Sequence, residues 1–160
     1  MDSLLWLMND EPVEVMSYAT KSSKPIFQKY EYPTTSSTMI KFKGGAIGKV
    51  ASVIDCIQPY LFNVHLVGAD GSILNDKFHS DHWEGLQKTG WSQLNVQLAD
   101  SGDVAHHPYV PLFQDFMDAI RQNREPELSF GSALLSHKTC MAAELSIERG
   151  VPVRLDELED

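Results

Sequence analysis

The stretch from Thr35 to Ile57, TSSTMIKFKGGAIGKVASVIDCI, contains the pattern that decides the fold. Apolar and polar residues alternate on both sides of Lys43-Gly44-Gly45, as is typical of two half-buried strands. Two adjacent glycines between such runs favour a β-hairpin, because both can adopt positive φ. A phosphate-binding loop is the competing interpretation of KGGAIGK. Lys43 stands where that motif needs glycine, and a strand is expected to follow rather than a helix, so we predict a hairpin.

Alternating runs on both sides of this hairpin extend the predicted sheet. Asp70-Gly71 marks a further tight turn between two of them. The additional runs cover residues 12–20, 60–67, 72–76 and 91–99. Residues 13–99 are therefore expected to form about six strands, the usual size of one sheet.

A change of period after the strands predicts helices. From Tyr109 to Ile120 apolar residues recur at helical spacing, and we place Phe116 in the seam between this helix and the sheet. Pro126 ends that segment, and a second helix is expected from about residue 131 to residue 149. A shorter helix over residues 2–10 precedes the first strand.

The second C-terminal helix is expected to end at Gly150, and a short strand over residues 151–155 to follow it. Cys140 is interpreted as a small core residue of this helix. Its apolar stripe contains Leu134, Met141 and Leu145. Strands followed by helices indicate an α+β fold, here a single domain over residues 1–160. We expect an open, mostly antiparallel sheet of about six or more strands, with helices covering one face.

The other face of the sheet also carries apolar side chains. In the run after the Gly-Gly turn, Val50, Ile54 and Cys56 point one way. The opposite side carries Ile47, Ala51, Val53 and Ile57. Because the helices cover only one face, the second face needs a partner, such as another subunit or another domain. We expect a homo-oligomer, in its simplest form a dimer, built through this open face.

Composition narrows the class of protein. The chain is 42% hydrophobic and 22% charged, as in ordinary globular proteins, and no apolar run approaches the ~20 residues of a membrane span. A net charge of −9 with scattered basic residues argues against nucleic-acid binding. Cys56 and Cys140 form no C-x-x-C pair, and no basic region begins a signal peptide. The cytoplasm is therefore the expected location.

Residue chemistry alone predicts no catalytic, cofactor-binding or metal-binding residue. His79 and His82 flank Asp81, and His106-His107 follows later, but this spacing matches no standard zinc pattern. Polar loop histidines are the favoured interpretation, with a metal site as the alternative. We find no Ser-His-Asp arrangement and no distinctive pair of carboxylates.

Several motifs in order resemble one enzyme family over nearly the whole chain. They are DSLLWLMNDEPVEVMSYAT, TMIKFKGGAIGKVASV, VHLVGADGSIL, and the long C-terminal run from His107 to Leu155. Together they are similar to the C-terminal domain of the Gfo/Idh/MocA oxidoreductases. That domain supplies substrate contacts and an oligomer surface, usually through the open face of its sheet.

The resemblance implies a parent enzyme with a preceding Rossmann domain. The chain has neither a Gly-rich dinucleotide fingerprint nor a Glu-Lys-Pro motif. In the family, the catalytic Asp and His precede the helix that corresponds to residues 2–10 of this chain. The isolated chain is therefore expected to be inactive and to bind no NAD(P). The parent is expected to use NAD or NADP to oxidise or reduce a sugar, cyclitol or related polyol.

The resemblance also implies substrate contacts just before VHLVG, at Gln58 and Tyr60. A phenol there can hydrogen-bond a substrate hydroxyl, while a tyrosine at a sheet edge is an equally weighted alternative. A rival function is a stand-alone, non-catalytic dimeric module for binding or scaffolding. A reading frame that continues upstream of Met1 into a Gly-rich domain would favour the enzyme; a frame that starts at Met1 would favour the module.

Overall fold

The computed structural model describes residues 1–59, 61–95 and 109–158, and the chain divides into two compact units. Unit 1 contains Met1–Ile57 and Pro111–Asp160, and unit 2 contains Gln58–Val110. Each unit has a four-stranded antiparallel sheet. The predicted α+β class with open antiparallel sheets is confirmed, with the strands distributed over two sheets. The single domain predicted over residues 1–160 stays a prediction.

Sheet A of unit 1 has the strand order β3-β2-β1-β8, so the first and last strands of the chain are neighbours. Its strands are β1 (Pro12–Thr20), β2 (Thr35–Phe42), β3 (Ile47–Val53) and β8 (Val153–Arg154). Val15 of β1 lies opposite Ile40 on one side and Val153 on the other, and all three are fully buried. This row is the centre of the core, and it joins the two ends of the chain.

The predicted hairpin between β2 and β3 is confirmed. Gly45 has φ of 93°, a conformation that L-residues with a side chain rarely adopt. The Gly45 amide donates to the carbonyl of Phe42, and the Phe42 amide donates to the carbonyl of Ala46. The Gly-Gly pair therefore closes a strand-to-strand turn.

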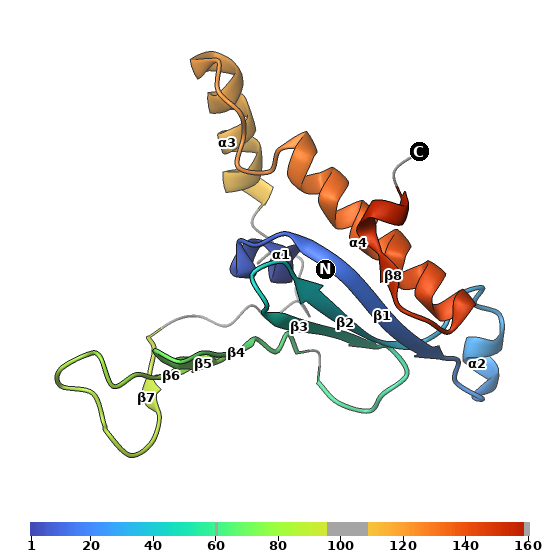
Figure 1. Cartoon of the computed structure of the whole chain (residues 1–160), viewed down its shortest axis with the longest axis horizontal. Helices are drawn as coiled ribbons and strands as arrows, with labels where there is room; N and C mark the ends of the chain where they lie inside the picture. Colours follow the sequence, from blue (N-terminus) through green and yellow to red (C-terminus); the bar gives the residue numbers. More distant parts are fainter. Residues whose placement is uncertain (60, 96–108, 159–160) are drawn as a thin grey trace. The chain divides into compact units, whose positions relative to one another are not determined.

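Two helices cover one face of sheet A: α1 (Asp2–Met8) and α4 (Phe130–Arg149). Figure 1 shows α4 running along β1. α1 approaches β3 closely at Gly48, where an added Cβ would lie 2.7 Å from a methyl carbon of Leu4 and 3.0 Å from the ring of Phe42. A glycine therefore lets α1 pack at this depth without displacing the side chains of Leu4 and Phe42.

The buried side of α4 differs from the predicted stripe. Leu134 and Met141 are exposed, and Cys140 is an exposed free thiol, so their placement in the core was wrong. The buried residues of α4 are Thr139, Ala142, Ala143 and Ser146. Small side chains allow the helix to lie close to the sheet, which a hydrophobicity pattern alone does not reveal.

Helix α3 (Tyr109–Gln122) forms as predicted, but its apolar stripe does not pack on the sheet. Phe116 is 51% exposed, so its predicted position in a helix–sheet seam was wrong. Ala119 is the buried residue of this helix. α4 ends at Gly150, with φ of 69°, as the sequence indicated.

Unit 2 is a meander of short strands with the order β4-β5-β6-β7. They are β4 (His65–Val67), β5 (Ser72–Leu74), β6 (Lys77–His79) and β7 (Ser92–Gln93). The predicted runs over 60–67 and 91–99 contain β4 and β7, which are much shorter, and residues 60 and 96–99 lie outside the described residues. β6 and the four-residue helix α2 (Pro25–Gln28) were not predicted from the sequence. In the described parts of the chain, no helix is both long and apolar enough to cross a membrane.

Candidate functional site

The face of sheet A opposite α4 carries many apolar side chains, and unit 1 leaves it open. Because side chains alternate along a strand, the neighbours of the buried Val15, Ile40 and Phe42 point to this open face. The apolar residues of the open face are Met16 and Tyr18 on β1, Met39 on β2, and Ile47, Ala51 and Val53 on β3, and the polar residues Glu14, Ser37, Lys41 and Lys49 share the face with them. Tyr18 and Ile47 are more than two-thirds exposed. Ile47, Ala51 and Val53 therefore lie on the uncovered face as predicted.

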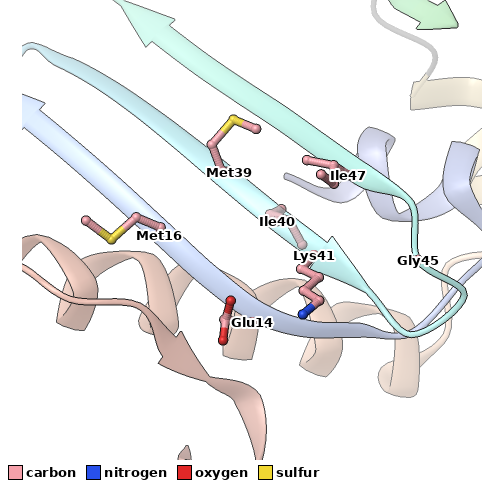
Figure 2. A pocket seen from close by; sticks show the side chains of 7 residues that line it. All are labelled: Glu14, Met16, Met39, Ile40, Lys41, Gly45 and Ile47. Carbon is pink, nitrogen blue, oxygen red and sulfur yellow. The ribbon is translucent and has the colours of Figure 1, made fainter.

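A shallow depression of about 270 Å³ lies at one end of this face (Figure 2). Met16, Met39 and Ile47 supply its apolar lining, with Glu14 and Lys41 beside them. Glu14 and Lys41 are register partners on β1 and β2, so the depression carries one charge of each sign. Flexible methionine side chains adapt well to an opposing protein surface. The lining includes no Ser, Thr, Cys or His, and its apolar and methionine side chains suit contact with another surface.

The predicted substrate residues are only partly described. Gln58 is exposed at the start of unit 2. Tyr60 lies outside the described residues. Their role in binding a substrate stays a prediction.

Asp55, which sequence reasoning missed, anchors the chain just after β3. Its two carboxylate oxygens accept hydrogen bonds from Thr34 Oγ1 at 3.0 Å and Thr35 Oγ1 at 2.9 Å. The hydrogen bond from Thr35 is the main cause that lowers the pKa of Asp55 below its ordinary value, with Thr34 and Ser22 contributing. The sequence shows only an adjacent Thr34-Thr35 pair, and its position opposite the end of β3 follows from the register of β2 and β3.

Two histidines of unit 2, His79 and His82, connect its turns. His82 Nε2 lies 3.0 Å from Asp70 Oδ1, and His79 Nδ1 lies 2.8 Å from the carbonyl of Gly90. Within residues 1–59, 61–95 and 109–158, no three His, Cys, Asp or Glu side chains are grouped to hold a metal ion. His106 and His107 lie outside those ranges.

The glycine turns do not suit a dinucleotide. The turn at Gly44-Gly45 joins β2 to β3, and the turn from Gly68 to Gly71 joins β4 to β5. A pyrophosphate is bound where a glycine turn leads from a strand into a helix N-terminus, because the free amides there point at the ligand. The residues of these two turns are therefore not candidates for cofactor binding.

Comparison with known proteins points to one group of enzymes. No family model matches the chain. The chain is 24% identical over 155 residues to scyllo-inositol 2-dehydrogenase (NAD(+)) of Bacillus subtilis strain 168. This match covers 97% of the chain and 45% of the relative. The chain thus spans about half the length of the curated relative it matches.

Solved structures show the same fold. An oxidoreductase domain protein from Kribbella flavida matches with a TM-score of 0.77 at 15% identity, over 96% of this chain and 47% of that one. The scyllo-inositol dehydrogenase from Lactobacillus casei, which holds NAD(H) and scyllo-inositol, matches with a TM-score of 0.69 at 13% identity, over 97% and 45%. The resemblance of this chain to the C-terminal domain of the Gfo/Idh/MocA oxidoreductases, indicated by its sequence motifs, is thereby confirmed.

Proposed function

We propose that the chain is the substrate-binding and dimerisation domain of an NAD(P)-dependent oxidoreductase that acts on a cyclitol, sugar or related polyol, in the cytoplasm. The observation that carries this proposal is the match of almost the whole chain to less than half of an inositol dehydrogenase. The likeness to the Lactobacillus casei enzyme supports the same class of substrate. NAD or NADP would supply the hydride chemistry on a part of the parent that this chain does not contain.

In this proposal, Gln58 and Tyr60 contact the substrate. Their amide and phenol groups suit hydroxyl groups of a polyol, which accept and donate hydrogen bonds. The 160-residue chain is expected to be inactive, because its two glycine turns each join two strands and do not suit the dinucleotide phosphates.

Dimerisation is assigned to the open face of sheet A. Leaving several hundred Å² of apolar surface in water costs several kcal/mol at ~25 cal/mol per Å². Two-fold pairing of like faces covers the same patch twice. Glu14 and Lys41 lie side by side on the open face and carry opposite charges. In a pair of like faces, Glu14 of one copy can therefore face Lys41 of the other.

The activity is tested on a parent that includes the upstream reading frame. NADH formation would be followed with scyllo-inositol, myo-inositol and simple sugars as substrates. We expect turnover of a cyclitol or sugar, a raised KM in Tyr60→Phe and Gln58→Ala, and no turnover by the 160-residue chain. NADH fluorescence should show no saturable binding to that chain. A parent that binds NAD(P)H and turns over none of these compounds would contradict the substrate class.

Oligomeric state is tested by light scattering on a sizing column. We expect a dimer for the 160-residue chain and a monomer for Val53→Glu, which places a carboxylate on the open face. Ile26→Glu, at an exposed apolar residue of α2, is the matched control and should stay dimeric. The rival function, a stand-alone binding module, would be supported by a dimeric chain whose reading frame starts at Met1.

A further inference from the structure

Asp55 lies where the chain leaves sheet A on its way to Gln58. Its carboxylate accepts hydrogen bonds from the hydroxyls of Thr34 and Thr35, at 3.0 and 2.9 Å, around the start of β2. The Ile54 amide also donates to the carbonyl of Thr34 at 3.0 Å. The end of β3 is therefore fastened to the neighbouring strand by main-chain and side-chain hydrogen bonds together.

The hydroxyl of Thr34 extends this connection to a third segment. It accepts a hydrogen bond from the backbone amide of Ser22 at 2.9 Å and donates to Asp55. Thr34 is only 2% exposed, and hydrogen bonds are stronger where water is largely excluded. Asp55 thus holds together the segments that follow β1, begin β2 and follow β3.

The ionised form of Asp55 is the form that these hydrogen bonds favour. An ionised carboxylate only accepts hydrogen bonds, and both threonine hydroxyls donate to it. The hydrogen bond from Thr35 is the main cause that lowers the pKa of Asp55, so the group is ionised at neutral pH. Asparagine would place an amide donor where one of the two acceptor oxygens lies, and one threonine would lose its partner.

Chain length keeps this anchor close to Gln58. An extended chain spans at most ~3.3–3.6 Å per residue, so the Cα atoms of Asp55 and Gln58 lie within about 11 Å of each other. This limit holds for every conformation of Cys56 and Ile57, the two residues between them. The contacts of Asp55 therefore restrict where the side chain of Gln58 can lie relative to sheet A.

We propose that Asp55 is a positioning residue for the polyol, acting through Gln58. This inference rests on the proposed function, in which the amide of Gln58 contacts a hydroxyl group of the substrate. Misplacing a contact group by ~1 Å can cost roughly 100-fold in rate. An anchor that limits the position of Gln58 therefore affects substrate binding, and Asp55 needs no contact with the substrate for this role.

The mechanical part of the proposal is tested in the 160-residue chain without turnover. NMR relaxation would give the backbone order parameters of residues 56–58 in the wild type and in Asp55→Asn. We expect them to fall from about 0.85, typical of rigid backbone, toward 0.6 in the variant. Order parameters that are already low in the wild type, or that stay high in Asp55→Asn, would overturn the proposal.

Asp10→Asn is the matched control. Asp10 accepts a hydrogen bond from the Gly44 amide at 2.9 Å, at the opposite end of β2 and β3. Its replacement removes a comparable contact of the same sheet, far along the strands from Gln58. The order parameters of residues 56–58 should stay at their wild-type values in this variant.

The functional part is tested in the parent that includes the upstream reading frame. Asp55→Asn and Thr35→Val each remove one group of the anchor. Both should raise the KM for the polyol about five- to tenfold, the usual effect of one lost hydrogen bond, with kcat and the KM for NAD(P) nearly unchanged. Thr35→Ser keeps the hydroxyl and should keep the wild-type KM. Asp10→Asn should keep it as well, whatever its effect on stability.

A double-mutant cycle separates positioning from a general loss of structure. Because Asp55 acts through Gln58, adding Asp55→Asn to Gln58→Ala should change the KM by less than about twofold further. Additive effects would overturn the positioning role and leave the proposed function standing. A wild-type KM in Gln58→Ala, or a parent that turns over no polyol, would overturn the substrate role of Gln58 and this proposal together.

Discussion

The hydroxyl of Ser146 on α4 accepts a hydrogen bond from the backbone amide of Ser17 on β1, at 3.0 Å. β8 pairs with β1 only at Glu14 and Val15, so the next outward-facing amide of β1 has no strand partner. Ser146 takes that place, and it donates in turn to the carbonyl of Val151 at 2.8 Å. A helix side chain thereby completes the edge of the sheet.

Ser146→Ala is expected to destabilise the chain by about 1–3 kcal/mol, the cost of leaving a buried donor unsatisfied. Both Ser17 and Ser146 are almost fully buried, so water does not replace the lost partner. The free energy of unfolding in urea measures the effect. Ser132→Ala, at an exposed position of the same helix, should change stability by no more than about 0.5 kcal/mol. Equal effects of the two variants would contradict the role of Ser146.

Gly48→Ala is expected to cost about 1–3 kcal/mol, because the new methyl group overpacks the contact between α1 and the sheet. The ring of Phe42, 1% exposed, has no room to move away from it. Thermal unfolding would detect the loss. Gly131→Ala is the matched control with the opposite sign, since its Cβ meets no atom closer than 3.7 Å and alanine favours a helix by roughly 0.5–1 kcal/mol.

Phe116→Ala is expected to cost less than about 1 kcal/mol in the 160-residue chain, because half of this side chain is already in water. Phe42→Ala removes a fully buried ring of the core and should cost about 3–5 kcal/mol. Urea unfolding of both variants provides the comparison. Similar losses would mean that α3 packs its stripe inside the isolated chain.

The contact of Asp115 with Arg124 predicts a pH dependence at acid pH. The hydrogen bond from Arg124 lowers the pKa of Asp115 below its ordinary value of 3.8, and the amide of Glu127 contributes. A carboxyl group with a lowered folded-state pKa stabilises the protein above its unfolded pKa, and this contribution is lost as pH falls through the folded pKa. The affected window therefore lies below pH 3.8.

Arg124→Met should raise the pKa of Asp115 toward 3.8, as followed by NMR titration of its carboxyl carbon. Asp115→Asn should lower stability at pH 5, and this effect should shrink as the pH falls below 3.8 through the lowered pKa of the folded-state carboxyl group. An Asp115→Asn effect that is independent of pH would show that the corner between α3 and α4 is held by shape rather than by charge.

Sequence patterns correctly located the turn at Gly45 and the end of α4 at Gly150, because a positive φ there favours glycine. The same patterns did not predict which side chains are buried, because burial depends on how each helix packs against the sheet. Leu134 and Met141 are apolar and exposed, while Ser146 and Thr139 are polar and buried, because the approach of α4 to the sheet selects small side chains. Periodicity ranks residues by hydrophobicity, and of the stripe that it selected, Leu145 packs against the core while Leu134 and Met141 do not.

The candidate site shows the same limit on prediction. Alternation in β3 correctly placed Val53 on the open face, since a strand has only two sides. The anchor at Asp55 depends on Thr34 and Thr35 lying opposite a strand end, which requires the register of two strands. The substrate role of Gln58 and Tyr60 rests on the resemblance, and no local pattern indicates it.

The pairing of β1 with β8 has a consequence for synthesis on the ribosome. The strand that organises sheet A is made first, and its neighbours α4 and β8 are made last. Translation proceeds at ~5–20 residues per second, so β1, β2 and β3 remain exposed for several seconds before α4 and β8 are synthesised. Closing so long a loop is slow, and unpaired strand edges aggregate. Expression of this chain should therefore depend on chaperones and gain from slower translation, whereas a circular permutant that begins at α3 would form unit 1 from consecutive residues.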